Sequence, residues 1–342
     1  MRTILFPAEW HPQSAVQLTW PHEQTDWAET LHEVLPCFER IALEILKRQA
    51  LIVVCADKEA VLRRLGNGHE GRLHVVEIPL NDTWARDHGG LSVFQDGIPT
   101  LLDFTFNGWG EKFDARMDNV ITSRLFEAHA FLPTVRFQCE QPFVLEGGSL
   151  ESDGKGTLLT TAQCLLAPHR NQPMNGVEIE NHLKQTLGVS RILWLREGYL
   201  AGDDTDGHID MLARFCDEDT IAYVAPPTWD DEHTEALSAM ECELKAFSTL
   251  NGKPYRLVPL PMATPVYHEG ERLPASYSNF LIINGAVLLP VYGLETDLAA
   301  VSQLQYLFPD REIVPIDCLP LIKQHGSLHC LTMQFPAGFV AC

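Results

Sequence analysis

The sequence has few of the features that mark extracellular, membrane or redox proteins. Its nine cysteines are odd in number and include no CxxC pair, which argues against a disulfide framework. The most apolar stretch, residues 280–289, is far too short to cross a bilayer. The first ten residues, from Met1 onward, lack the apolar core of a signal peptide. We therefore expect a cytoplasmic protein with reduced thiols and no membrane partner.

Basic residues are also scarce. Lys and Arg number 25 against 46 Asp and Glu, which gives a formal net charge of −21. A nucleic-acid binder needs a basic face, so this balance disfavours nucleic acid as a partner. The charge would help to attract a small cation, although solubility alone is enough to account for most of it.

No Ser/Gly linker, low-complexity tract or long charge run divides the 342 residues. Strand-like and helix-like segments alternate, which predicts an α/β fold. The predicted strands are residues 15–18, 51–54, 73–78, 158–161, 191–195, 221–225 and 280–290. The predicted helices are residues 26–48, 58–65, 177–187, 230–247 and 295–307. We expect the first helix to bend or split at Pro36 and the last to carry Glu295 and Asp297 in its first turn.

Separate motifs carry residues suited to the chemistry of a guanidine. They contain Asp87, Glu146, the pair His208 and Asp210, and Cys330. A thiolate is a competent nucleophile, and a histidine moves protons near neutral pH. Carboxylates match the fork of N–H donors on a guanidinium group. The combination predicts a cysteine hydrolase that acts on a small cationic guanidino substrate.

The spacing of these motifs is regular. The gaps between Asp87, Glu146, His208 and Cys330 are 59, 62 and 122 residues, the last close to twice the others. This recurrence predicts a repeated mixed α/β module that sends one loop per repeat to a shared axis, with residues 279–285 filling the skipped interval. An ordinary two-domain α/β protein is the alternative.

Each motif also has a plain structural interpretation. Cys330 alone reads as a buried structural cysteine, and Glu146 as a turn residue before two glycines. His208 and Asp210 would share a face if they lay on a strand, and with Asp203 and Asp204 they would form a metal site. Against a metal, the sequence has no HExxH, no His-x-His and no Cys/His cluster of zinc spacing.

Together the motifs resemble the agmatine deiminases of the bacterial peptidyl-arginine-deiminase-type family, in the guanidino-modifying (pentein) superfamily. The resemblance runs nearly from end to end. It covers residues 7–12, 18–22, 84–89, 106–110, 145–149, 153–157, 202–210 and 328–334.

The resemblance implies a five-bladed α/β propeller of repeated ββαβ modules around a central axis, as a single catalytic domain over residues 1–342. It implies Cys330 as nucleophile, His208 as general acid/base, and Glu146, Asp210 and Asp87 around the guanidinium. Substrate-binding roles fall, by the same resemblance, to Trp84, Trp109 and Asp204.

The implied reaction hydrolyses agmatine to N-carbamoylputrescine and ammonia through a covalent Cys-amidino intermediate, in putrescine biosynthesis. It needs no cofactor or metal, and a homodimer is left open. The family's agmatine enzymes often carry Ile-His where this chain has Leu150 and Glu151. A deiminase of free or peptidyl arginine, an amidinotransferase, a metal-dependent hydrolase and a non-catalytic propeller therefore stay as alternatives.

Overall fold

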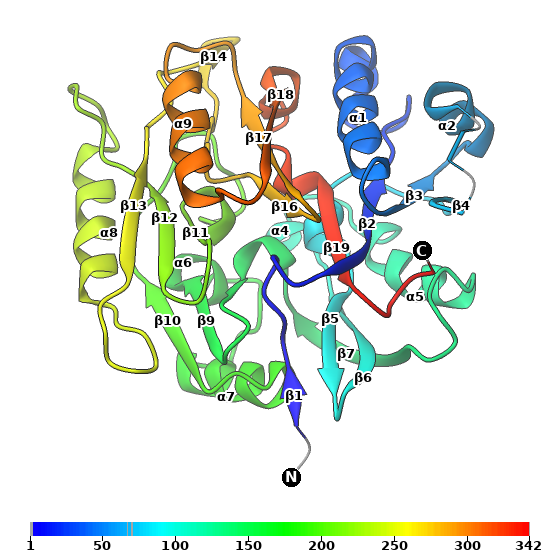
Figure 1. Cartoon of the computed structure of the whole chain (residues 1–342), viewed down its shortest axis with the longest axis horizontal. Coiled ribbons are helices and arrows are strands. Elements are labelled where there is room, and N and C mark those ends of the chain that lie inside the picture. Colours follow the sequence, from blue (N-terminus) through cyan, green and yellow to red (C-terminus); the bar gives the residue numbers. More distant parts are fainter. Residues whose placement is uncertain (1–2, 67, 70, 342) are drawn as a thin grey trace.

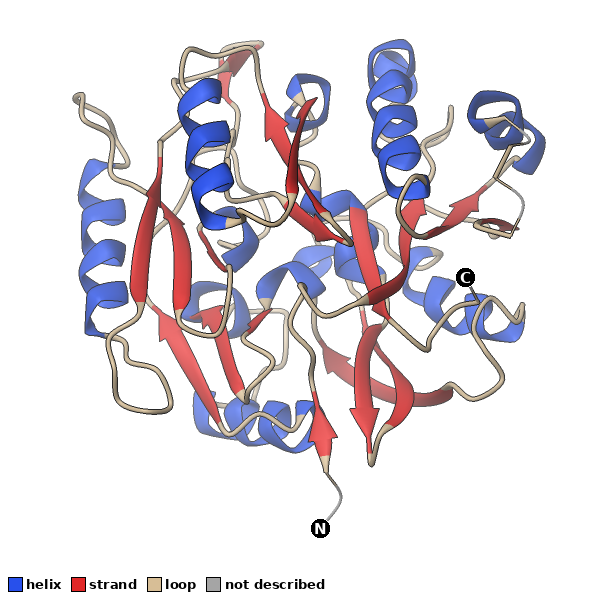
Figure 2. Ribbon diagram, in the orientation of Figure 1, coloured by secondary structure: helices blue, strands red, loops and turns tan. Residues whose placement is uncertain are grey.

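The computed structural model describes residues 3–66, 68–69 and 71–341. Met1 and Arg2, from the signal-peptide argument, and Cys342, one of the nine cysteines, lie outside the described residues. Helices and strands alternate along the chain in an α/β fold, as predicted (Figure 1). The long helices lie toward the outside of the molecule (Figure 2). No helix in the described ranges is long and apolar enough to cross a membrane.

Five of the six sheets formed by the described residues share one arrangement. In each, a central strand pairs antiparallel with one neighbour and parallel with another. In that order, the three strands of the five sheets are β19 (Thr332–Pro336), β2 (Gln13–Thr19) and β3 (Ala50–Cys55); β5 (Leu91–Gln95), β6 (Ile98–Thr105) and β7 (Arg136–Val144); β8 (Glu151–Ser152), β9 (Thr157–Thr161) and β10 (Arg191–Leu195); β11 (Ala213–Phe215), β12 (Thr220–Val224) and β13 (Arg256–Leu260); and β16 (Leu281–Ile283), β17 (Ala286–Val291) and β18 (Glu312–Asp317).

A helix connects the two parallel strands of every such sheet, because parallel strands need a long crossover. In sheet order these helices are α1 (Leu31–Leu46), α5 (Ile121–Glu127), α7 (Gly176–Leu187), α8 (Thr234–Ala246) and α9 (Asp297–Leu307). The first sheet gains β4 (Leu73–Glu77) after α2 (Lys58–Leu65), the second gains β1 (Ile4–Leu5), and β14 (Tyr267–His268) pairs with β15 (Glu271–Arg272). The remaining helices are short: α3 (Ala85–His88), α4 (Gly108–Glu111), α6 (Ala162–Leu165) and α10 (Leu319–Ile322).

Local sequence explains these elements. All six residues of β3 are buried, since a parallel strand covered on both faces is apolar throughout. At the start of α7, Asn175 accepts hydrogen bonds from the backbone of Val177 and Glu178, and the Glu178 side chain accepts one from the Asn175 backbone. This capping box satisfies N–H groups that have no partner inside the helix.

The structure corrects three predicted elements. Residues 280–290 form the antiparallel hairpin β16–β17 rather than one strand, because Gly285, at φ +72°, turns the chain after Asn284. Helix α1 runs through Pro36 without a split, held by a buried face that includes Phe38 and Ile41. Helix α9 begins at Asp297, so only this acid, not Glu295, lies in its first turn.

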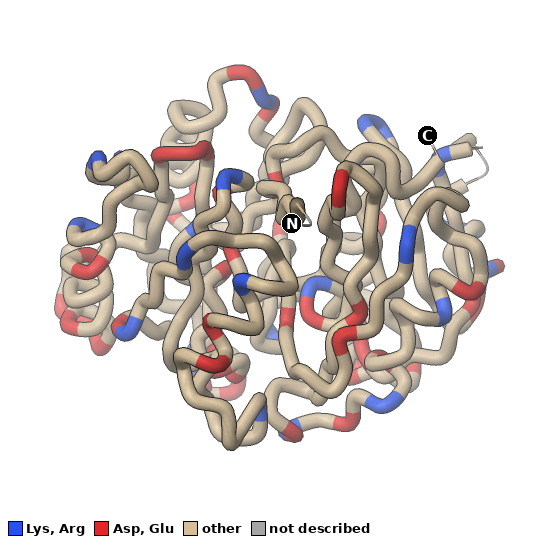
Figure 3. Tube along the Cα trace, turned by 90° about the horizontal axis from the view of Figure 1, so that it is seen from below, with Lys and Arg blue, Asp and Glu red and all other residues tan. Residues whose placement is uncertain are grey.

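The last strand of the chain belongs to the first sheet. β19 pairs antiparallel with β2, with Thr332 opposite Leu18. This pairing fixes the segment that precedes β19, which holds Cys330. Charged residues of both signs lie along the whole trace and also near its centre (Figure 3).

Candidate active site

The residues singled out in the sequence meet where the five repeated sheets send out loops. Each lies after the last strand of a different sheet: Asp87 follows β4, Glu146 follows β7, His208 follows β10, Asn279 follows β13 and Cys330 follows β18. Residues 279–285 were expected to fill the skipped interval, and Asn279 contacts Cys330.

Cys330 lies in a 3₁₀ turn, residues 329–331, immediately before β19, and is 5% exposed. The Asn279 side-chain amide donates to its sulfur at 3.3 Å, and the Asn279 Oδ1 accepts from the His329 backbone at 2.8 Å. Burial raises the pKa of the Cys330 thiol well above its usual value, and the charges of Asp210 and Asp87 add to the effect. Burial and the two carboxylates therefore favour the neutral thiol over the thiolate.

The two-residue spacing of His208 and Asp210 would place both side chains on one face of a strand, but the two residues do not lie on a strand. His208 precedes the 3₁₀ turn 209–211, which contains Asp210. The preceding loop is closed by Asp203, whose carboxylate accepts hydrogen bonds from the backbone of Thr205 and Gly207. The turn compresses the chain, and both side chains reach the site, 1% and 0% exposed.

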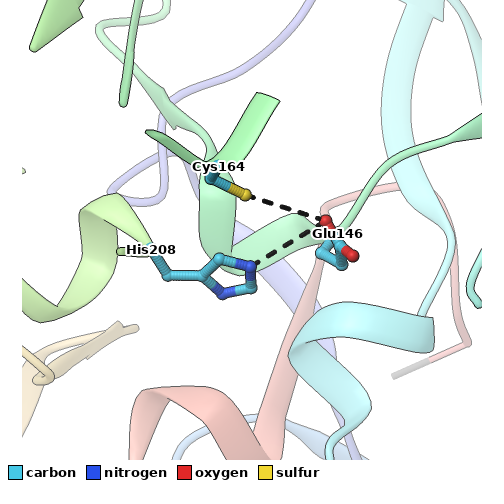
Figure 4. A group of neighbouring side chains, drawn as sticks. All are labelled: Glu146, Cys164 and His208. Atoms are coloured by element: carbon cyan, nitrogen blue, oxygen red, sulfur yellow. Dashed lines mark hydrogen bonds and ion pairs between the residues drawn. The ribbon is translucent and has the colours of Figure 1, made fainter. Parts of the chain in front are cut away.

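His208 lies among anionic groups. Its Nδ1 is 3.6 Å from Asp87 Oδ1 and its Nε2 is 3.9 Å from Glu146 Oε2. Figure 4 shows the imidazole with Glu146 and Cys164, whose sulfur is 3.9 Å from the same Oε2. Burial lowers the pKa of His208, but Asp87, Cys164 and Glu146 outweigh it and raise the pKa well above its usual value. The ring therefore holds a proton that it can donate near neutral pH.

Asp87 lies in the short helix α3 and is 3% exposed. Its Oδ2 accepts a hydrogen bond from Trp109 Nε1 at 3.0 Å, and its Oδ1 accepts one from the Gly148 backbone at 3.0 Å. Burial raises the pKa of Asp87 to about 6, against the opposing effect of His208. Trp109 is thus held by the carboxylate that it helps to orient.

Glu146 lies behind His208 rather than along the cavity wall. Its Oε1 is 2.8 Å from Arg170 Nε, and both side chains are 1% exposed. Arg170 also forms an ion pair with Asp206 at 3.0 Å and donates to the Thr205 carbonyl at 3.2 Å. Arg170 therefore connects Glu146 to the loop that carries His208.

A cavity of about 660 Å³, measured to its open mouth, reaches Cys330 from the surface. Trp84, Trp109 and Asp204 line it, as does Asp87, so these predicted residues come together. Residues that the sequence analysis did not select share the wall: Asp26, Asp82, Phe113, Thr205, Gln324, His325 and Gly326. Acidic and aromatic groups dominate, which suits a cation with an apolar stem.

Two buried groups of side chains place donor atoms close enough to hold a metal ion, within the described part of the chain. They are Glu146, Cys164 and His208, and Glu9, Glu151 and His329. An arginine already compensates each: Arg170 beside Glu146, and Arg214 at 3.0 Å from Glu9. The alternative metal set of Asp203, Asp204, His208 and Asp210 is not one of these groups.

Similarity to a known protein family extends over almost the whole chain. A model of the Porphyromonas-type peptidyl-arginine deiminases matches residues 5–336, almost the whole sequence. The chain belongs to this peptidyl-arginine deiminase family.

Relatives of the family share its fold over their full length. A Porphyromonas gingivalis structure described as a candidate arginine deiminase is 57% identical, with a TM-score of 0.96 over 99% of this chain and 100% of its own. A C. jejuni agmatine deiminase, solved as a cysteine-to-serine variant with substrate bound, is 34% identical, with a TM-score of 0.91 over 98% and 96%. The agmatine deiminase of Stutzerimonas stutzeri is 31% identical over 98% and 96%.

Some residues of the candidate site were missed from sequence. Arg170 and Cys164 lie in segments with no recognisable motif, and no sequence pattern could have found them. His329 and Glu9 lie within the quoted segments 328–334 and 7–12, but neither was given a role. Their contacts appear only when the two ends of the chain are brought together.

Proposed function

We propose that the chain is an agmatine deiminase that uses Cys330 as its nucleophile. One observation carries the proposal: a buried cysteine and an acid-lined, aromatic-walled cavity meet at a point where a histidine and several carboxylates converge. Relatives named agmatine deiminases, 31% and 34% identical over nearly their whole length, support the same activity.

The guanidinium would lie between Asp87 and Asp210. Asp210 Oδ1 and His208 Nε2 are buried and have no hydrogen-bond partner among the described residues. A buried polar atom without a partner is costly, so a bound guanidinium that donates to Asp210 would relieve that cost. Glu146 supports this arrangement from behind, by keeping His208 protonated.

The positive charge of the substrate would activate the thiol. A cation beside a buried sulfur lowers its pKa, so Cys330 loses its proton to solvent when the guanidinium binds. The thiolate then forms a bond to the central carbon, and the former double-bond electrons return to nitrogen. His208 donates its proton to the leaving nitrogen, the C–N bond breaks and ammonia departs.

Hydrolysis of the covalent amidino intermediate reverses the role of His208. The neutral imidazole takes a proton from water while the water oxygen attacks the same carbon. Collapse of the adduct breaks the C–S bond, returns the thiolate and releases the ureido product, N-carbamoylputrescine. The proposed steps use only protein side chains and water. We propose that they take place in the cytoplasm.

We also propose that the five repeated modules close into a five-bladed propeller, as a single domain with Cys330 near its axis. The pairing of β19 with β2 supports closure, because it joins the last module to the first. The placement of one site residue after the last strand of each sheet supports a common centre.

The composition of the cavity supports agmatine over arginine. Asp26, Asp82 and Asp204 line it, where carboxylates would stabilise a terminal ammonium and repel an α-carboxylate. The 57%-identical relative described as a candidate arginine deiminase makes arginine the second candidate.

A ureido-product assay with agmatine, free arginine and an arginine peptide tests the proposal. We expect turnover of agmatine that EDTA does not inhibit. We expect Cys330→Ala to abolish that turnover, and Cys139→Ala, at an exposed cysteine, to leave it unchanged. Turnover of arginine instead would keep the chemistry and change the substrate. Full activity in Cys330→Ala would remove the mechanism.

A further inference from the structure

A row of buried ionic contacts extends from Asp210 away from the cavity and ends at Glu9, near the other end of the sequence. His329 lies between them: its Nδ1 is 2.8 Å from Asp210 Oδ2 and its Nε2 is 2.7 Å from Glu9 Oε2. The three side chains are 0%, 1% and 8% exposed. The proposed reaction assigns no role to His329 or Glu9.

Hydrogen-bond chemistry fixes the state of this imidazole. An ionised carboxylate only accepts hydrogen bonds, and a neutral imidazole donates through one nitrogen alone. Burial opposes the charged form of both carboxylates, yet nearby cations prevail: Arg214 and His329 hold the pKa of Glu9 far below its usual value, and His329 lowers that of Asp210. With a carboxylate oxygen at each ring nitrogen, His329 must donate from both and is an imidazolium.

Glu9 is held from its other side as well. Its Oε1 accepts a hydrogen bond from the Ile282 backbone at 2.7 Å, and its Oε2 is 3.0 Å from Arg214 Nη2 and 3.6 Å from Arg86 Nη2. Every oxygen of Glu9 is therefore engaged, so the carboxylate cannot rotate away from His329 without losing several charge-assisted contacts.

We propose that Glu9 is a positioning residue for deimination: through the imidazolium of His329 it holds Asp210 ionised, with one oxygen committed to His329 and the other directed to the guanidinium. This inference rests on the proposed function, since it needs the substrate to bind Asp210. The commitment of Oδ2 to His329 leaves Oδ1 without a partner among the described residues, as a substrate acceptor requires.

The surroundings of His329 contain the other charges that bear on its titration. Arg86 donates from Nε to the His329 carbonyl at 3.4 Å, and Arg214 is paired with Glu151 as well as Glu9. The charged or titratable groups around the row are Glu9, Arg86, Asp87, Glu151, His208, Asp210, Arg214, Arg311 and Cys330.

Glu9→Gln tests the proposal by removing one charge while keeping the shape of the side chain. The amide oxygen can still accept a hydrogen bond from His329, but without a negative charge it stabilises the imidazolium less, so the effect of His329 on the ionisation of Asp210 is weakened. We expect kcat/KM for agmatine to fall at least about tenfold, the loss of one charge-assisted hydrogen bond. Because Asp210 then protonates at a higher pH, its titration should add to that of Asp87 and move the acid limb of the kcat/KM profile to higher pH.

Glu44→Gln is the matched control. Glu44, on α1, is 2% exposed and pairs with Arg40 and with Lys47 and Arg48 just beyond the helix, and it does not line the cavity. Its replacement should lower the melting temperature and leave the pH profile of kcat/KM unchanged. An unchanged profile in Glu9→Gln would overturn the proposal, and a matching shift in Glu44→Gln would show that the shift reports stability alone.

A second measurement does not depend on whether Glu9→Gln folds. Ring-nitrogen NMR of the His208→Asn variant should show a histidine protonated on both ring nitrogens, because each nitrogen of His329 faces a carboxylate oxygen. His233, the other histidine tightly paired with an acid, accepts the Ala201 N–H on Nε2 and so is singly protonated. Absence of this doubly protonated histidine would overturn the proposal. A wild type inactive on every guanidine would instead remove the proposed function.

Discussion

Arg170 and Glu146 form a buried ion pair, with 2.8 Å between Nε and Oε1. The pair occupies the glutamate from the side opposite His208, so Glu146 stabilises the histidine rather than the cavity wall. The same arginine also contacts Asp206 and the Thr205 carbonyl. Arg170 therefore binds both Glu146 and the loop that precedes His208.

The replacement Arg170→Met should therefore destabilise the protein. It breaks the buried pair and leaves Glu146 with the more distant His208, at 3.9 Å, as its compensating charge, and breaking a buried pair typically costs about 3–5 kcal/mol. Urea unfolding monitored by circular dichroism measures the difference. The control is Arg116→Met, since Arg116 pairs with Asp114 but is 89% exposed and should leave the unfolding midpoint unchanged. Equal midpoints for Arg170→Met and wild type would show that the buried pair adds nothing.

The acid limb of activity should report Asp87. Because the pKa of Asp87 is raised to about 6, its carboxylate gains a proton, and loses its attraction for guanidinium, as the pH falls through that value. Trp109→Phe removes an N–H donor that favours the ionised form, so we expect the acid limb of kcat/KM to move to higher pH.

Profiles between about pH 5 and 9 are the measurement. Trp229→Phe is the matched control, because Trp229 donates to Asp231 at 3.1 Å in a region that does not line the cavity. If the acid limb of kcat/KM lies at the same pH in Trp109→Phe as in the wild type, the ionisation of Asp87 does not cause it.

Position 148 needs a glycine because there is no room for a side chain, and not because of its backbone conformation. A Cβ at this position would lie 2.6 Å from His208 Nδ1 and 2.8 Å from Asp87 Oδ1. Gly148→Ala should therefore displace both side chains and lower kcat by at least about 100-fold, as small misplacements of reacting groups do. Gly176→Ala, where the nearest atom would be 3.5 Å away, should remain active. A fully active Gly148→Ala would mean that the two side chains can move without loss.

The carboxylates of Asp26, Asp82 and Asp204, which line the cavity, should distinguish substrates by the group at the end opposite the guanidinium. Asp204→Asn should raise KM for agmatine about fivefold, equivalent to a screened ion pair of about 1 kcal/mol, with little change in kcat. Butylguanidine, which lacks the terminal ammonium, is the control and should keep its KM. An equal increase for both compounds would assign Asp204 a role in cavity shape instead.

Much of the site could be predicted from sequence because its residues recur at a regular interval. Asp87, Glu146, His208 and Cys330 each follow the last strand of a sheet, and the doubled gap before Cys330 contains Asn279. Single residues could also mislead: the two-residue spacing of His208 and Asp210 indicated a strand, where Asp203 closes a tight loop and a 3₁₀ turn follows.

The rest depended on contacts that no local pattern encodes. Residues 91–144 contain three strands that were not predicted. β7 is largely exposed and lacks a continuous apolar run, and β5 and β6 carry polar residues, such as Ser92 and Asp103, within mostly buried strands. The hairpin at Asn284 and Gly285 did carry a signal, an Asn-Gly pair between apolar runs, which is typical of a two-residue turn. Arg170 and Glu9 matter through partners distant in sequence, so only the folded chain reveals them.

The pairing of β19 with β2 has a consequence for how the protein is made. The strand beside the thiol has its partner almost a whole chain length away, so this ladder is among the most non-local in the fold, and such contacts form late and slowly. During synthesis the first sheet lacks this neighbour on one side until β19 has left the ribosome. Cys330 would therefore acquire its buried surroundings only at the end of folding, and a half-made chain would carry no competent nucleophile.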